Sequence, residues 1–113
     1  MKRLCFAIVL AITLLFFPTL APVYAADLVN GAKIFNANCS ACHVGGNNVI
    51  IAAKTLKKEA LEKYSMDSLA AIKTQVTQGK NAMPAFSGRL NEQQIEDVAS
   101  YVLSQSSKGW SGS

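Results

Sequence analysis

With 113 residues, the chain has room for one domain and no more. It carries 11 Lys and Arg residues against seven Asp and Glu, and half of its residues are hydrophobic. A mildly basic chain of this kind favours electrostatic steering toward an acidic patch on a protein partner and argues against nucleic-acid binding.

The first 25 residues have the pattern of a secretory signal peptide. Lys2 and Arg3 form a basic start, and a mostly apolar run follows over residues 4–20. The run is of borderline length for a membrane span, so a retained anchor is the alternative. Two prolines near its end and the small residues after them favour removal, and we expect cleavage between Ala25 and Ala26.

Cleavage there leaves a domain of 88 residues, 26–113, which we expect not to be embedded in a membrane. The domain keeps nine basic and seven acidic residues, a charge of +2. So small a domain has a limited hydrophobic core, and it needs disulfides, a metal or a cofactor for additional stability. Cys5 leaves with the leader, so only Cys39 and Cys42 remain for that purpose.

Apolar periodicity predicts an all-α domain of about four short helices joined by long loops, with no convincing strand. Loops this long in a small domain favour a central group that they wrap. The Ser-rich residues 106–113 are expected to form a flexible tail. The four helices are expected over residues 27–38, from a cap at Thr55 to Tyr64, from a cap at Ser65 to a stop at Gly79, and from a capping box at Asn91 and Gln94 through Leu103.

The sequence Cys39-Ser40-Ala41-Cys42-His43 is the C-x-x-C-H signature of covalent haem attachment. Two thiols one helical turn apart can reach the two vinyl groups of one porphyrin, and His43 then ligates the iron from the same side. A redox-active or structural disulfide is the first alternative. A zinc site is the second, but it wants two further Cys or His ligands that the exported domain does not contain.

A second axial ligand has to come from elsewhere, because His43 is the only histidine. Methionine, lysine and water are the candidates. Met83 precedes Pro84 in a non-helical stretch that can present a thioether to the iron, whereas Met66 begins an amphipathic helix where Met most often packs in the core. We favour Met83 as the ligand and keep core packing as its alternative.

The run from Gln75 to Phe86 (QVTQGKNAMPAF), with the C-x-x-C-H motif and the following GGNNV, resembles the cytochrome c6 family of cyanobacteria and algal chloroplasts. The resemblance covers residues 26–110. It implies the class I cytochrome c fold, in which the N- and C-terminal helices cross, here at Gly31, Phe35 and Tyr101. It also implies one haem c, attached through Cys39 and Cys42 and ligated by His43 and Met83. Gln75 would lie against the haem and help to set its potential, and Arg89 would dock to photosystem I.

Two strong protein ligands would leave the iron no open position for oxygen, peroxide or a substrate, so we expect a one-electron carrier and not an enzyme, acting as a monomer. The resemblance adds the partners and the location. The partners would be the cytochrome b6f complex and photosystem I in the thylakoid lumen, with cytochrome oxidase as an additional acceptor and the periplasm as an additional location. Three alternatives remain open. They are a respiratory donor with the same haem site, a haem peroxidase or ligand sensor in which Met83 is labile, and a disulfide oxidoreductase.

Overall fold

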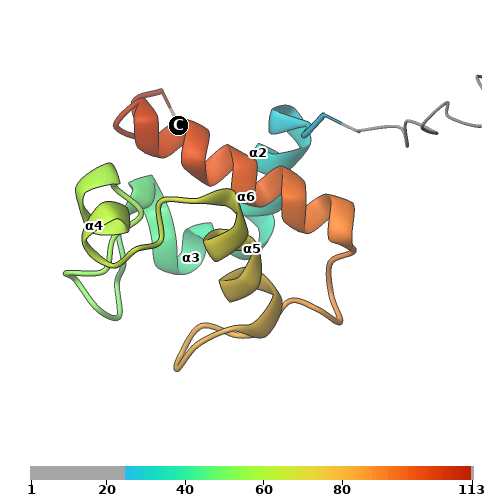
Figure 1. Ribbon diagram of the computed structural model, residues 1–113, viewed down its shortest axis with the longest axis horizontal. Coiled ribbons are helices and arrows are strands. Elements are labelled where there is room, and N and C mark those ends of the chain that lie inside the picture. Colours follow the sequence, from blue (N-terminus) through green and yellow to red (C-terminus); the bar gives the residue numbers. More distant parts are fainter. Residues whose placement is uncertain (1–24, 113) are drawn as a thin grey trace, which may run out of the picture.

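The computed structural model describes residues 25–112, and apart from Ala25 the predicted leader lies outside them. This part of the chain is helical, and its only strand-like pairing is an isolated bridge between Lys80 and Met83. No helix within it is long and apolar enough to cross a membrane. In chain order its elements are α2 (Leu28–Asn38), α3 (Ser40–His43), the 3-10 turn η1 (Val44–Gly46), α4 (Lys58–Lys63), α5 (Leu69–Gln78) and α6 (Glu92–Ser107) (Figure 1).

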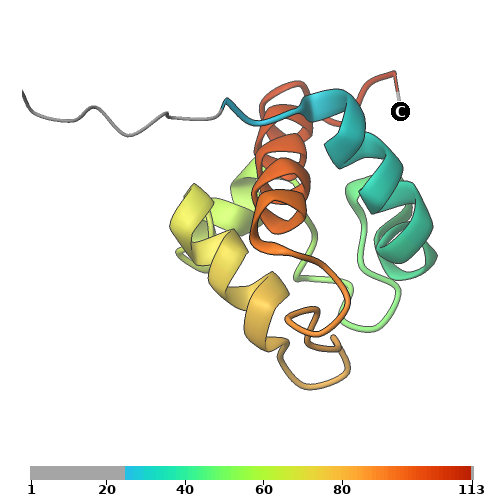
Figure 2. The same cartoon turned by 90° about the vertical axis from the view of Figure 1, so that its right-hand side faces the viewer.

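Helices α2 and α6 cross, and the expected close approach at Gly31 is confirmed (Figures 1 and 2). A Cβ atom on Gly31 would lie 2.2 Å from the Asp97 backbone oxygen and 2.8 Å from the Tyr101 Cβ. The two helices therefore meet backbone to backbone at this point, which only a residue without a side chain permits. Phe35 and Tyr101 flank the crossing, as expected, with ring centroids 5.4 Å apart.

Asp97 joins the start of α2 to the middle of α6. The residue is 2 % exposed, and its carboxylate accepts hydrogen bonds of 2.9 Å from the Asp27 amide, the Asn30 side chain and the Gln93 side chain. Burial by itself raises the pKa of Asp97, but the hydrogen bonds outweigh it and hold the pKa below its ordinary value. The carboxylate therefore stays ionised and ties together two helices that are about 70 residues apart in the sequence.

The expected helices are all present, but two of them begin later than predicted. Lys57 is the N-cap of α4, and the Thr55 hydroxyl instead accepts a hydrogen bond from the Lys57 amide in a short turn. Ser68 is the N-cap of α5, whereas Ser65 has a positive φ of 55°. Ser and Thr favour turns as readily as helix caps, so a nearby turn can take the residue that the pattern assigns to a cap.

The later boundaries predicted from the sequence agree with the structure. The capping box at Asn91 is present, because its side chain accepts from the Gln94 amide while the Gln94 side chain accepts from the Asn91 amide. Helix α5 ends at Gly79, which has a φ of 68°. Lys73 of α5 pairs with Glu96 of α6 and fixes the two helices side by side.

The C-terminal residues differ from the expected tail. Helix α6 continues to Ser107, and a Gly109 with a φ of 68° then ends it. The Gly109 amide bonds to the Ser106 carbonyl and the Trp110 amide to the Gln105 carbonyl, which is the Schellman pattern of a helix end. Ser106 and Trp110 are each only 7 % exposed. The chain is thus packed as far as Trp110, four residues beyond the expected start of the tail.

The core fills the space between the crossing helices and the loops on one side of them. Phe35, Tyr101 and Trp110 form an aromatic cluster with ring centroids 5.2 to 6.2 Å apart. The other buried hydrophobic residues are Ile34, Leu61, Ile72, Val76, Phe86, Ile95, Val98, Ala99 and Val102. Several of them also line the cavity described next, so one continuous apolar surface serves as both core and cavity wall.

Candidate haem site

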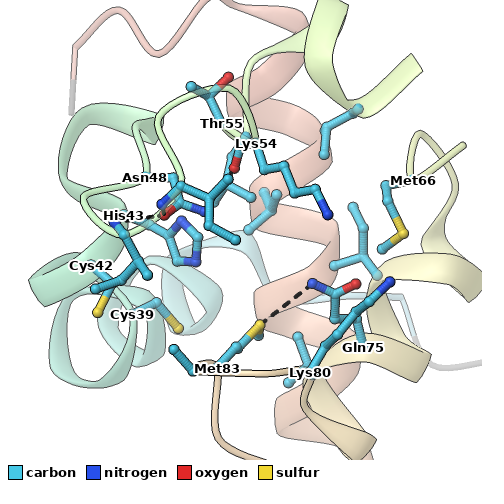
Figure 3. A pocket seen from close by; sticks show the side chains of 18 of the residues that line it. Cys39, Cys42, His43, Asn48, Lys54, Thr55, Met66, Gln75, Lys80 and Met83 are labelled. Carbon is cyan, nitrogen blue, oxygen red and sulfur yellow. Dashed lines mark hydrogen bonds between the residues drawn. The ribbon is translucent and has the colours of Figure 1, made fainter. Parts of the chain in front are cut away.

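A cavity of about 270 Å³ lies between α3, α5, α6 and the loops that follow α3 and α5. Figure 3 views it from close by. Apolar side chains from the core form its floor, and the polar and sulfur-containing residues that the sequence singled out project from its rim. Those site residues are Cys39, Cys42, His43, Gln75 and Met83, and all five line the cavity.

The C-x-x-C-H motif forms a single helical turn. Helix α3 follows α2 directly, and the amides of Cys42 and His43 bond to the Cys39 carbonyl at 3.2 and 2.9 Å. No disulfide joins the two cysteines, and Cys39 is half-buried while Cys42 is exposed. One turn therefore presents two sulfur atoms and an imidazole to the same cavity, which is the arrangement expected for two thioether bonds and an iron ligand.

The protonation of Cys39 argues against the disulfide oxidoreductase alternative. Burial, and to a lesser extent the charge of the neighbouring Cys42, raises the pKa of the Cys39 thiol to about 11. Redox-active C-x-x-C motifs work the other way, because a lowered pKa keeps the attacking thiolate available at neutral pH. The surroundings of Cys39 thus do not fit the attacking thiol of a redox-active motif.

His43 is held by one hydrogen bond in a fixed orientation. Its Nδ1 lies 3.0 Å from the Asn47 backbone oxygen. A carbonyl oxygen only accepts, so Nδ1 carries the proton and donates it, and Nε2 is left with a free lone pair. The ring points into the cavity (Figure 3). This is the tautomer in which a histidine ligates a metal through Nε2.

Met83 lies in a loop that is closed by backbone hydrogen bonds. The amide of Lys80 bonds to the Met83 carbonyl at 2.9 Å, and the Met83 amide bonds back to the Lys80 carbonyl at 3.0 Å. A Cβ atom on Gly79 would lie 2.6 Å from the Met83 oxygen, so the tight return of the chain requires a glycine there. The Phe86 amide bonds to the Val76 carbonyl at 2.9 Å and anchors the far end of the loop on α5.

The sulfur of Met83 receives a hydrogen bond from Gln75. The Gln75 Nε2 lies 3.6 Å from the Met83 Sδ, and both side chains are half-buried. Met66 also lines the cavity, and both methionines pack against the core, but Met66 lies at the opposite end from Cys39 in Figure 3. The sequence favoured Met83 over Met66 as the ligand, and of the two sulfur atoms only that of Met83 has a hydrogen bond recorded among the described residues.

Arg89 does not line the cavity. Its side chain is exposed, and its guanidinium carbon lies 5.6 Å from the centroid of the Phe86 ring. Two residues that the sequence reasoning did not single out do lie at the cavity, namely the exposed lysines Lys54 and Lys80. The sequence offered a signal only for Lys80, because Lys80 lies in the same loop as Met83. It offered none for Lys54.

The residues fit covalent haem better than any of the alternatives. Neither a zinc ion nor a disulfide accounts for an imidazole with a free Nε2 and a hydrogen-bonded thioether in one apolar cavity, whereas haem uses both together with the two thiols. The domain is therefore a class I c-type cytochrome. Cytochrome c6 of Gloeothece citriformis is 58 % identical over 110 residues, which is 97 % of this chain and all of that relative. The chain belongs to the cytochrome c6 family.

Further comparisons agree with this assignment. Cytochrome c6 of Thermostichus vulcanus is 60 % identical over 108 residues, covering 95 % of this chain and 96 % of the relative. The structure of cytochrome c6 from the diatom Phaeodactylum tricornutum superposes with a TM-score of 0.74 at 54 % identity, over 75 % of this chain and all of that one. The family described as cytochrome C oxidase, cbb3-type, subunit III also matches residues 26–102. The identities over nearly the whole chain assign it to the cytochrome c6 family within that broader match.

Membership settles the cofactor and the general function. The chain carries one covalently bound haem c and is an electron-transfer protein of photosynthesis, not an enzyme. The predicted class I fold is confirmed by the crossing of α2 and α6 and by the structural neighbours.

Proposed function

We propose that this protein is a soluble one-electron carrier whose iron is ligated by His43 and Met83. The observation that carries the proposal is the pair of oriented donors in one cavity. The Nε2 of His43 is freed by the bond from Nδ1 to Asn47, and the Sδ of Met83 is fixed by Gln75. When bound, haem c supplies a one-electron couple at this position.

Each site residue has a distinct part in that function. Cys39 and Cys42 hold the cofactor through thioether bonds, so the small domain does not depend on a deep pocket to retain it. With His43 and Met83 both as ligands, the iron of a bound haem would have no open position for oxygen, peroxide or a substrate. Gln75 orients the Met83 sulfur and places the positive end of an amide dipole beside it, which tunes the potential.

The surface around the cavity suits a brief encounter with an acidic partner. Lys54 and Lys80 are exposed at its edge, and nearby Val49 and Ile50 expose 60 % and 61 % of their surface. Electron-transfer encounters use small, weak interfaces of this mixed character, which allow rapid release. The lysines would speed association at low salt, and added salt would screen them.

By family, the donor is the cytochrome b6f complex and the acceptor is photosystem I. We place this exchange in the thylakoid lumen after removal of residues 1–25, with cytochrome oxidase as a second acceptor and the periplasm as a second location. Arg89, which is exposed and stacked on Phe86, is proposed as a docking residue on photosystem I. The carrier is proposed to act as a monomer.

Optical spectra test the axial ligands. The purified ferric protein should have the weak far-red band of a methionine–iron bond, and the reduced protein should have a sharp c-type α-band. Met83→Ala should lose the far-red band and, once reduced, bind carbon monoxide at neutral pH. The control is Met66→Ala, which removes the other methionine lining the cavity and should keep the band. Loss of the band in Met66→Ala instead would reverse the assignment, and carbon monoxide binding by the unaltered protein would favour the peroxidase or sensor alternative.

Flash-induced kinetics test the partner. The reduced protein should be oxidised by photosystem I particles in a reaction that slows as salt is added, and Arg89→Gln should slow it further. Lys108→Gln is the control, because Lys108 is exposed at the far end of α6 and does not line the cavity. Oxidation by cytochrome oxidase but not by photosystem I would favour the respiratory donor.

A further inference from the structure

Trp110 lies flat against the backbone of Gly46. A Cβ atom built on Gly46 would be 2.5 Å from three atoms of the indole ring, so the ring occupies the space where any other residue would carry its side chain. Gly46 is buried and has a φ of 77°, a conformation that also favours glycine. The last turn of the chain thus packs on the turn that directly follows the C-x-x-C-H motif.

Two hydrogen bonds close this contact into a ring of three residues. The Trp110 Nε1 donates to the Leu56 carbonyl at 3.0 Å, and the Leu56 amide donates to the Gly46 carbonyl at 2.7 Å. The indole also contacts Gly46. The segments around Gly46, Leu56 and Trp110 therefore each contact the other two. The segment around Leu56 and the turn at Gly46 therefore have one position relative to the indole.

The indole itself is fixed by the helix crossing. Its ring centroid lies 5.2 Å from that of Phe35 in α2 and 6.2 Å from that of Tyr101 in α6. Trp110 also has a φ of 59°, which is unusual for a residue with a side chain and persists only where the surroundings hold it. The Schellman hydrogen bonds at the end of α6 and the aromatic cluster stabilise this backbone conformation of Trp110.

Gly46 ends the turn η1, which begins next to His43. The Asn47 amide bonds to the Val44 carbonyl at 3.1 Å, and the Asn47 carbonyl accepts the proton of the His43 Nδ1 at 3.0 Å. We propose that Trp110 is a positioning residue for His43. By holding η1 in place, its indole keeps the Asn47 carbonyl where it fixes the tautomer and the orientation of the imidazole.

This inference rests on the proposed ligation of iron by His43. The partner of the second ring nitrogen sets the orientation and the basicity of a metal-bound histidine. A shift of η1 would therefore reach the iron through the imidazole, although Trp110 does not line the cavity. A tryptophan near the C-terminus would in this way contribute to the electronic properties of the site.

The test compares three variants of the haem-loaded protein. Trp110→Ala removes the ring, and Trp110→Phe keeps a ring against Gly46 but loses the hydrogen bond to Leu56. Ile95→Ala is the control, because Ile95 is buried in α6 but does not line the cavity, so its loss weakens the fold without touching η1. Proton NMR of the reduced protein follows the exchange of the His43 Nδ1 proton with water, and spectroelectrochemistry gives the potential.

Trp110→Ala should speed exchange of the His43 Nδ1 proton by about tenfold or more, since the hydrogen-bonded turn loses its support. It should also shift the potential. Trp110→Phe should have an intermediate effect, and Ile95→Ala should leave both quantities as they are. Unchanged exchange in Trp110→Ala, or equal changes in Ile95→Ala, would overturn the proposal. If Trp110→Ala does not fold, Trp110→Phe decides by the same criteria. If the NMR spectrum of the unaltered, reduced, haem-loaded protein shows no ring-current-shifted His43 imidazole resonances, the proposed ligation by His43 fails first, before any variant is made.

Discussion

Replacing Gly31 with alanine adds one methyl group at the crossing of α2 and α6. In an isolated helix this change would stabilise by about 1 kcal/mol, because alanine has the higher helix propensity. Here the new Cβ would lie 2.2 Å from the Asp97 oxygen and 2.8 Å from the Tyr101 Cβ, more than 1 Å inside ordinary contact with the first of these. Both obstacles belong to or adjoin the backbone of α6, so neither can turn away, and the helices have to separate.

Overpacking of a rigid core site costs about 1–3 kcal/mol and occasionally more, and a clash with backbone belongs at the upper end of that range. After subtracting the gain in propensity, we expect a net loss of about 2 kcal/mol, which for a domain of this size lowers the melting temperature by about 10 °C. Circular dichroism of the haem-loaded protein measures the melting temperature. Gly88→Ala is the matched control, because a Cβ atom there meets nothing within 4 Å. A melting temperature within about 2 °C of the unaltered protein would refute the backbone contact.

Two further predictions concern a buried carboxylate and a bond to sulfur. Asp97→Asn should lower the free energy of unfolding by about 2 kcal/mol near neutral pH, since an amide cannot accept all three hydrogen bonds. The folded state holds the pKa of Asp97 below its ordinary value, so this difference should be complete above about pH 4 and shrink as the pH falls through the lowered pKa. Denaturant titrations from acid to neutral pH measure it, and a constant difference would be inconsistent with the lowered pKa. Gln75→Val should lower the potential, because the positive end of the amide no longer disfavours the oxidised iron near Met83, and Gln78→Val on the exposed end of α5 serves as its control.

The sequence predicted the cofactor and the helices because these follow from local patterns. The two thiols and the imidazole of the motif lie on one turn, so their spacing alone brings them together. The same holds for the capping box at Asn91 and for the end of α5 at Gly79. Local rules failed at the starts of α4 and α5, where Ser and Thr form turns instead of caps.

The part of the site that depends on distant contacts was less accessible. Loop context favoured Met83 over Met66, but it did not predict the hydrogen bond from Gln75 to the Met83 sulfur, which depends on how the loop after α5 folds back. Trp110 was assigned to a tail because the preceding residues are rich in serine. Yet Gly109 followed by a large apolar residue is the pattern of a Schellman helix end, and it could have indicated that the chain packs there.

The crossing of α2 and α6 also determines when the domain can fold. Helix α2 has 11 residues, too few to be stable alone in water, and its partner α6 is the last helix of the chain. The contacts that bury α2 join residues about 70 positions apart, so they form only after nearly the whole chain is available. In a chain that crosses a membrane with its N-terminus first, the turn with Cys39 and Cys42 therefore emerges before α6 is present to hold α2 in place. The topology leaves an interval in which the haem-binding turn is not yet part of a folded domain.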